Sequence, residues 1–269
     1  MAAKSKDFVA KPNPMNGRCR LISGNWKMNL NHLEAIALVQ KLHYSLRESD
    51  YRYAEISVHP PFTALRSIQL LLETDRVPIS LGAQNTYFET SGPFTGEVSP
   101  SMLNKLGVKY VIVGHSERRD IFGETDEVVS KKTKAVLDAQ MIPIVCVGES
   151  LKEKQEEMTE AVLTHQVEAV VSGVNSEGCE SLVFAYEPKW AIGSGMPAGA
   201  SDAVRGAEVI RATVSKFHGE EVASKVRVQY GGSVNSANAK EFMEQKEIDG
   251  LLVGGASLSS EAFAAVIQA

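Results

Sequence analysis

The sequence predicts an α/β protein that folds as a single closed (β/α)8 barrel. From residue 20 to the end of the chain, short β-branched or apolar runs alternate with amphipathic segments, which is typical of parallel βα units. Eight such units follow one another at a spacing of roughly 30 residues, as in barrels of this kind. An open, doubly wound sheet is the competing architecture, but the number of units and their spacing favour the barrel. No composition break or Pro/Ser-rich linker divides the chain, so we expect one domain.

Each element is expected from its local pattern. The expected strands span Arg20–Ile22, Glu55–His59, Ile79–Ala83, Tyr110–Val113, Ile142–Val147, Leu182–Tyr186, Arg227–Tyr230 and Gly250–Val253. The expected helices span His32–Arg47, Thr63–Leu72, Ser99–Leu106, Thr125–Ala139, Thr159–Val171, Ser201–His218, Ser236–Met243 and Ser260–Gln268. Thr125, Ser201 and Ser236 are suited to cap helix starts, and Gly107 and Gly219 stand where helices should end.

The composition excludes several classes of protein. The 269 residues are 43% hydrophobic and 23% charged, with a net charge of −5, which suits a chain with a large buried core. No face is evidently basic, so we expect no nucleic acid partner. The cysteines are three, widely spaced and without a CxxC pair, so neither a zinc site nor a disulfide framework is predicted. No run of about 18 apolar residues occurs, so we expect no membrane span.

The first 17 residues differ from the rest of the chain. They carry Lys4, Lys6 and Lys11 but no apolar core segment, so they do not resemble a signal peptide. We therefore expect a flexible N-terminal extension over residues 1–17, a catalytic barrel domain over residues 18–269, and a reduced, cytoplasmic protein.

Glu187 stands where the sixth expected strand ends, because Pro188 cannot donate a hydrogen bond to a sheet. The loop behind it has an apolar middle at Trp190–Ile192 and a glycine hinge at Gly193–Gly195. We interpret this segment as a carboxylate base at a strand end under a lid. The alternative is a surface loop that packs its own tryptophan and leaves Glu187 in solvent.

Paired glycines follow the seventh and eighth strands. Gly231-Gly232-Ser233 and Gly254-Gly255 each precede an expected helix, where backbone N–H groups and the helix dipole favour an anion. Either pair alone is more often a tight turn. Two successive barrel loops of this kind indicate a phosphate site.

Two further strand ends carry polar side chains. Asn25 and Lys27 follow the first strand and would point to the same side if extended, so that Lys27 places a cation in the cleft. His115 follows the fourth strand, and a short helix opened by Ser116-Glu117 would lower the pKa of its imidazole. The alternatives are a solvated lysine and a structural histidine. For Arg118 and Arg119 we expect plain ion pairs.

The motifs of nucleotide and metal enzymes do not occur. The chain has no Gly-Lys dipeptide and no HExxH, and the glycines after Gly193 lack the dinucleotide-binding spacing, so we predict no cofactor and no metal. A carboxylate base, an imidazole, a lysine cation, a phosphate cradle and a lid suit proton abstraction beside the carbonyl of a small phosphorylated sugar. In this interpretation Glu187 takes the proton, and Lys27 and His115 stabilise the enediolate.

Six sequence motifs together resemble the triosephosphate isomerase family, whose members share the TIM barrel. They are Asn25-Trp26-Lys27-Met28-Asn29, Gly82-Ala83-Gln84-Asn85, Phe94-Thr95-Gly96-Glu97, Gly114-His115-Ser116-Glu117-Arg118-Arg119, Ala185-Tyr186-Glu187-Pro188 with Trp190-Ala191-Ile192-Gly193, and Tyr230-Gly231-Gly232-Ser233-Val234. The motifs occur in order and cover the chain from about Arg20 to Ala269. Lys189 and Ser194 depart from the family pattern, since an apolar residue and a threonine are common there.

The resemblance implies interconversion of dihydroxyacetone phosphate and glyceraldehyde 3-phosphate, in glycolysis and gluconeogenesis. It implies that Glu187 is the base, His115 the electrophile and Lys27 the electrostatic residue. It also implies that Asn25 contacts the substrate, whereas Gly193, Ser233, Gly254 and Gly255 hold phosphate. It further implies a homodimer, in which the Phe94-Thr95-Gly96 loop inserts near the partner's active site and Thr95 helps to hold Lys27 and His115.

Two other functions compete with this one. A catalytically silent barrel that binds a phosphorylated metabolite could keep the fold, but it would have no need of Glu187, Lys27 and His115 together. A related phosphosugar isomerase would need a larger pocket than the short lid suggests. Isomerisation of dihydroxyacetone phosphate by the purified protein distinguishes these alternatives.

Overall fold

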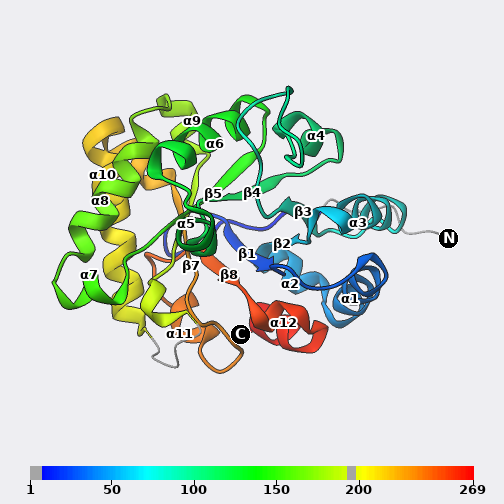
Figure 1. Ribbon diagram of the computed structural model, residues 1–269. Coiled ribbons are helices and arrows are strands. Elements are labelled where there is room, and N and C mark those ends of the chain that lie inside the picture. Colours follow the sequence, from blue (N-terminus) through cyan, green and yellow to red (C-terminus); the bar gives the residue numbers. More distant parts are fainter. Residues whose placement is uncertain (1–7, 193–197) are drawn as a thin grey trace.

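Eight parallel strands close into a barrel in the computed structural model, which describes residues 8–192 and 198–269 (Figure 1). The strands are β1 (Arg20–Asn25), β2 (Ala54–His59), β3 (Ser80–Ala83), β4 (Tyr110–Val113), β5 (Ile142–Val147), β6 (Val183–Tyr186), β7 (Arg227–Tyr230) and β8 (Gly250–Val253). Each strand pairs with its neighbour in sequence, and β1 closes the barrel against β8, with Leu21 opposite Gly250. The predicted (β/α)8 barrel is confirmed.

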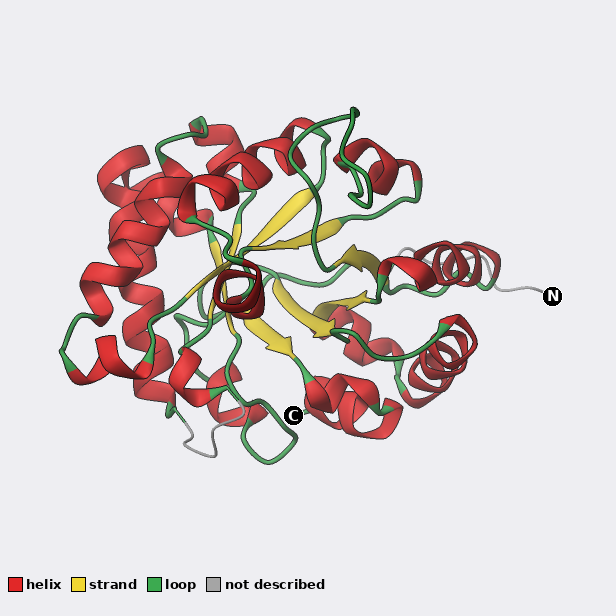
Figure 2. Cartoon of the chain, in the orientation of Figure 1, coloured by secondary structure: helices red, strands yellow, loops and turns green. Residues whose placement is uncertain are grey.

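Helices surround the barrel as an outer layer (Figure 2). They are α1 (His32–Ser45), α2 (Glu48–Tyr53), α3 (Phe62–Thr74), α4 (Pro100–Lys105), α5 (Ser116–Phe122), α6 (Asp126–Asp138), α7 (Leu151–Gln155), α8 (Thr159–Val171), α9 (Ser176–Glu180), α10 (Ala200–Lys225), α11 (Ala239–Met243) and α12 (Ser260–Ile267), with 3-10 turns η1 (Lys189–Ala191) and η2 (Gly255–Leu258). The large apolar core lies between the helices and the strands. A second, smaller cluster joins Leu21 of β1 to Ile144 of β5, which face each other only through the barrel interior.

Several predicted helix boundaries are confirmed by their caps. Thr125 caps α6 by accepting a hydrogen bond from the Val128 N–H at 3.3 Å. Gly107 and Gly219 have φ of 68° and 85°, and Gly219 interrupts α10 where the helix was expected to end. Ser236 does not start a helix, because the side chains of Asn235 and Asn238 close a turn over these residues and α11 begins only at Ala239.

Short helices are the elements that the sequence did not predict. The helices α2, α7 and α9 have five or six residues each, too few for a periodic pattern to show. Local caps support them instead: Ser150 caps α7 and Asn175 caps α9. The expected helix from His32 to Arg47 is α1, which ends at Ser45, and the unpredicted α2 follows after Leu46 and Arg47.

The chain before β1 lies against the barrel from residue 8 onward. Phe8 packs on Tyr51 with ring centroids 5.9 Å apart, and Asn13 is fully buried. Arg18 donates from Nε to the Asp249 carboxylate at 2.7 Å. These contacts join the segment to α2 and to the start of β8.

The barrel interior contains a polar row that the sequence analysis did not identify. Ser57 donates to Ser23 at 2.9 Å, and Gln229 donates to the same Ser23 hydroxyl at 2.9 Å. His59 lies in this row, with its ring between Ser57 Oγ at 3.1 Å and the Ala83 carbonyl at 3.1 Å. Complete burial lowers the pKa of His59 to about 4.

We predict that His59 makes the protein less stable in mild acid. Its folded pKa of about 4 lies below the unfolded value of about 6.5, so only the unfolded chain takes up this proton between them. The contribution of His59 to the free energy of unfolding is fully present above pH 6.5 and is lost as the pH falls towards 4. Urea unfolding should show a loss of about 2 kcal/mol between pH 7.5 and 5 that is absent in His59→Gln. The exposed His165→Gln should keep the wild-type slope, and a His59→Gln slope equal to wild type would refute this assignment.

Candidate active site

Alternation along the strands brings the first site residues to the carboxyl end of the barrel. Successive residues of a strand point to opposite faces, so Asn25 continues the inward row that Leu21 begins. Glu187 likewise continues the inward row of Ala185 beyond the end of β6. Both side chains line a cavity of about 340 Å³. The cavity is also lined by Lys27, His115, Ile192, Gly231, Gly232, Ser233, Val234, Asn235, Leu252, Gly254, Gly255 and Ala256.

Glu187 is buried, and both of its carboxylate oxygens are engaged. Oε1 lies 3.1 Å from Nε2 of His115, and Oε2 accepts a hydrogen bond from the Ser116 N–H at 3.1 Å. Burial raises the pKa of Glu187, but His115 and the Ser116 N–H lower it more, so the pKa lies below its ordinary value. The side chain is therefore an ionised carboxylate inside a cavity, and not the solvated group of the alternative interpretation.

His115 caps the helix α5 that follows β4. The Glu117 N–H donates to its Nδ1 at 3.2 Å, so the ring carries its hydrogen on Nε2, towards Glu187. Burial lowers the pKa of His115, but Glu187 and Glu117 raise it more, and the pKa lies above its ordinary value. The prediction of a lowered pKa is wrong for this arrangement, because the Glu187 carboxylate lies beside the ring.

Lys27 reaches the cavity from a strained backbone. Its φ is 53°, in the left-handed region, so the segment is not extended as the sequence analysis assumed. Asn25 Oδ1 accepts from the Lys27 N–H at 3.1 Å, and the Gln84 amide donates to the Lys27 carbonyl at 2.8 Å. The Lys27 ammonium lies 2.6 Å from Glu117 Oε1. These contacts hold the cation at the rim of the cavity.

The glycine loops after β7 and β8 complete the cavity, but only one of them opens a helical turn. Gly255 begins η2 directly after β8, which leaves its first N–H groups free of helical partners. After β7 a turn intervenes, and the next helix starts at Ala239. A Cβ on Gly231 would lie 2.8 Å from Glu187 Cγ, so the loop after β7 also forms a wall beside the Glu187 side chain.

Glu149 anchors the segment behind the base, and the sequence analysis did not identify it. Its carboxylate accepts from Trp190 Nε1 at 2.7 Å and from the Tyr186 hydroxyl at 3.1 Å. Its carbonyl accepts from the Lys189 N–H at 3.0 Å. Glu149 follows β5, so the position after that strand was the available signal. Gly193 and Ser194 lie outside the described residues.

The chain matches the family model of triosephosphate isomerase over residues 20–269. The triosephosphate isomerase of Streptomyces avermitilis is 49% identical, with 94% of this chain and 98% of the relative covered. Those of Saccharopolyspora erythraea and Carboxydothermus hydrogenoformans are each 49% identical, covering 90% and 92% of this chain and 93% and 97% of the relative.

The chain belongs to the triosephosphate isomerase family. The resemblance drawn from the sequence motifs is thereby confirmed. The two arginines of the family motif after β4 make ion pairs as expected, Arg118 with Glu124 and Arg119 with Asp126. Glu117 of the same motif differs, since it pairs with Lys27 and so joins the motif after β1 to the motif after β4.

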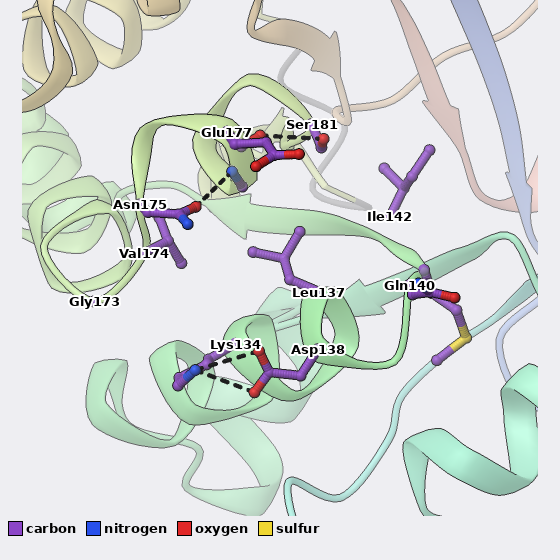
Figure 3. Close-up of a pocket in the computed structure, with 12 residues that line it drawn as sticks. Lys134, Leu137, Asp138, Gln140, Ile142, Gly173, Val174, Asn175, Glu177 and Ser181 are labelled. Atoms are coloured by element: carbon purple, nitrogen blue, oxygen red, sulfur yellow. Dashed lines mark hydrogen bonds and ion pairs between the residues drawn. The ribbon is translucent and has the colours of Figure 1, made fainter.

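A larger cavity, of about 520 Å³, lies at the opposite end of the barrel (Figure 3). It is lined by the end of α6, the start of β5 and the segment around α9. Its polar side chains make local contacts: Lys134 pairs with Asp138 at 3.1 Å, and Asn175 caps α9. Asn25, Lys27, His115, Glu187 and Ser233 of the family motifs line the other cavity.

Neither a metal centre nor a membrane span is found among residues 8–192 and 198–269. This part of the chain contains no group of three or more His, Cys, Asp or Glu side chains arranged to hold a metal ion. It also contains no helix with the length and apolar character needed to cross a bilayer.

We predict that Gly231→Ala impairs catalysis more than folding. The added methyl would meet the Glu187 side chain, which must then turn away from its place in the cavity. The value of kcat should fall at least about tenfold, as misplaced reacting groups cost rates of this order or more. Steady-state kinetics and thermal melting measure the two effects. Gly173→Ala is the matched control, because Gly173 does not line the cavity that contains Glu187, and its added methyl would lie 3.3 Å from the Ser130 hydroxyl and 3.7 Å from the Val170 carbonyl oxygen. Wild-type kcat in Gly231→Ala would contradict the role given to this wall.

Proposed function

We propose that Glu187, His115 and Lys27 carry the isomerisation of triose phosphates in this protein. The chain is a triose-phosphate isomerase by family, and it interconverts dihydroxyacetone phosphate and glyceraldehyde 3-phosphate. The observation that supports these residue roles best is the cavity at the carboxyl end of the barrel, where all three side chains meet. The silent barrel is not favoured, because it gives no reason for a buried carboxylate beside an imidazole and a lysine.

Glu187 is the general base in this proposal. Its carboxylate is ionised and shielded from water, so it can take the proton from the carbon next to the substrate carbonyl. An oxygen of Glu187 must first leave its contact with the Ser116 N–H. The base then returns the proton to the neighbouring carbon, and the hydroxyl proton passes from one enediolate oxygen to the other, which together convert the ketose into the aldose.

His115 and Lys27 stabilise the negative charge that develops on the enediolate oxygens. The Nε2–H of His115 can donate to an oxygen once Glu187 has turned to the substrate. Nδ1 accepts the Glu117 N–H and therefore carries no hydrogen, so the imidazole acts as a neutral donor through Nε2. Lys27 adds a fixed positive charge at the cavity rim.

Asn25 and the glycine loops bind the substrate in this proposal. Asn25 lines the cavity and also holds the Lys27 backbone. The phosphate group is assigned to the backbone N–H groups around Ser233, Gly254 and Gly255, together with Gly193, which lies outside the described residues. No cofactor is required by this mechanism, because proton transfer alone converts one isomer into the other.

Replacing Glu187 by glutamine tests the base. The amide keeps the shape of the side chain but cannot accept the proton, so kcat should fall by about 10²- to 10⁴-fold. Binding of glycerol 3-phosphate, which lacks the carbonyl, should change little. A coupled spectrophotometric assay and isothermal titration calorimetry provide the measurements. A wild type that binds glycerol 3-phosphate but isomerises neither triose would instead support the silent barrel.

We also infer that the chain forms a homodimer through the Phe94-Thr95-Gly96 loop. This loop precedes α4 and stands out from the barrel in Figure 1, with Phe94 packed on Tyr87 at 4.7 Å and Thr95 exposed. Met28, next to Lys27, is 95% exposed. An exposed apolar side chain beside the site is suited to a partner that covers it.

Introducing a charge in this loop tests the dimer. Thr95→Arg should shift the sedimentation of the protein from dimer to monomer and lower kcat, since Lys27 and His115 lose support from the partner. Tyr44→Arg, at an exposed position on α1, should sediment and react as the wild type does. A monomeric wild type with full activity would contradict the proposed assembly.

The remaining assignments follow from the same function. We propose that residues 18–269 are the catalytic domain, that residues 1–17 are an extension without a catalytic role, and that the enzyme works in the cytoplasm in glycolysis and gluconeogenesis. Its triose phosphate substrates are small anions, which suits a cavity with a lysine at its rim.

A further inference from the structure

Lys189 departs from the family pattern, and it makes a contact of its own. Its ammonium lies 2.6 Å from Oδ1 of Asp120, a residue near the end of α5. Lys189 stands two residues after Glu187, and α5 begins directly after His115. The ion pair therefore joins the segment that carries the base to the helix that follows the electrophile.

This ion pair is the second of two contacts between the same two segments. In the first, the Ser116 N–H donates to Glu187 Oε2 at 3.1 Å. Ser116 and Asp120 are four residues apart, so they lie one turn apart on the same face of α5. Glu187 and Lys189 are two residues apart, on either side of Pro188, and both of their side chains reach α5. The two contacts thus lie one helical turn apart along α5.

The main chain of Lys189 is fixed by the segment after β5, the strand that lies between β4 and β6. Its N–H donates to the Glu149 carbonyl at 3.0 Å, after β5. Trp190, the next residue, donates from Nε1 to the Glu149 carboxylate at 2.7 Å. With its backbone held at β5, the Lys189 side chain spans the distance to α5. It resists any movement of residues 187–189 away from that helix.

We propose that Lys189 and Asp120 are positioning residues that hold Glu187 in its docked place on α5. This inference rests on the proposed role of Glu187 as the base. In the docked place both oxygens of Glu187 are engaged, by His115 and by the Ser116 N–H, and one must become free to accept a proton. The ion pair stabilises the docked arrangement, so it opposes the release of the base.

The exposure of the pair limits the size of the effect. The Asp120 side chain is 53% exposed and that of Lys189 is 22% exposed. Ion pairs of this kind contribute little, so their loss should change a population by about two- to fivefold. Dissolved salt screens them, so the effect should shrink at high ionic strength.

Lys189→Met tests the proposal, because it removes the charge but keeps most of the chain length. We expect kcat/KM to rise about two- to fivefold. The acid limb of its pH profile should move to higher pH, because a less tightly docked Glu187 loses part of what lowers its pKa. Competitive inhibition by inorganic phosphate, which reports the glycine loops, should be unchanged. A variant that only lost folding stability would not show a shift of the acid limb to higher pH.

A double-mutant cycle shows whether Lys189 acts through Asp120. Asp120→Asn should reproduce the effect of Lys189→Met, and the double variant should show no further gain. The ratio of kcat/KM in Lys189→Met to kcat/KM in the wild type should approach one in high salt. Lys134→Met, which breaks the exposed pair with Asp138 on α6, is the matched control and should leave every parameter unchanged.

Three outcomes would overturn the proposal. They are an unchanged kcat/KM and pH profile in Lys189→Met, a fall in kcat/KM, and additive effects of the two single substitutions. A wild type without isomerase activity would refute the proposed function itself. If instead the wild type is active and Lys189→Met has the same kcat/KM, only the role of the ion pair is refuted.

Discussion

The buried carboxylate of Glu187 is the group on which the arrangement of the site depends. A carboxylate without water requires hydrogen-bond donors or cations close by, and here it has the His115 ring and the Ser116 N–H. Both donors come from the turn between β4 and α5, so this turn has to lie against the end of β6. Gly231 provides the space on the other side. The barrel supplies this proximity because all its strands run parallel and end at one mouth.

In the proposed mechanism, the same contacts make Glu187 a weak base while it is docked. Donors that lower the pKa of Glu187 stabilise its charge, whereas proton abstraction needs a free oxygen facing the substrate. The proposed mechanism thus requires a stable resting arrangement of Glu187 and a reactive one. Lys189, two residues after Glu187, is held by Glu149 and by Asp120, and these contacts influence the balance between the two arrangements. A residue that departs from the family pattern, such as Lys189, can then shift this balance while the proposed reacting groups stay those of the family.

Motif positions and strand order could be predicted from local patterns. The alternation of apolar runs predicted all eight strands, because buried parallel strands read as short continuous apolar stretches. Five- and six-residue helices such as α2 and α9 could not be predicted in this way, since caps and tertiary packing stabilise them more than periodicity does. Glu149 was missed for a related reason: its position after β5 was the one available signal, and its role shows only in the fold, where Trp190 and Tyr186 donate to it.

The (β/α)8 architecture, the family and the residues at the strand ends can all be predicted from the amino-acid sequence. These depend on local hydrophobic patterns and on motifs that remain readable in one dimension. Only the tertiary structure decided how these residues act on one another. It placed Lys27 in a left-handed backbone beside Glu117, and it raised the pKa of His115 instead of lowering it. The physical reason is that desolvation and Coulomb energies depend on distances between groups far apart in sequence, such as His115 and Glu187, which no local pattern contains.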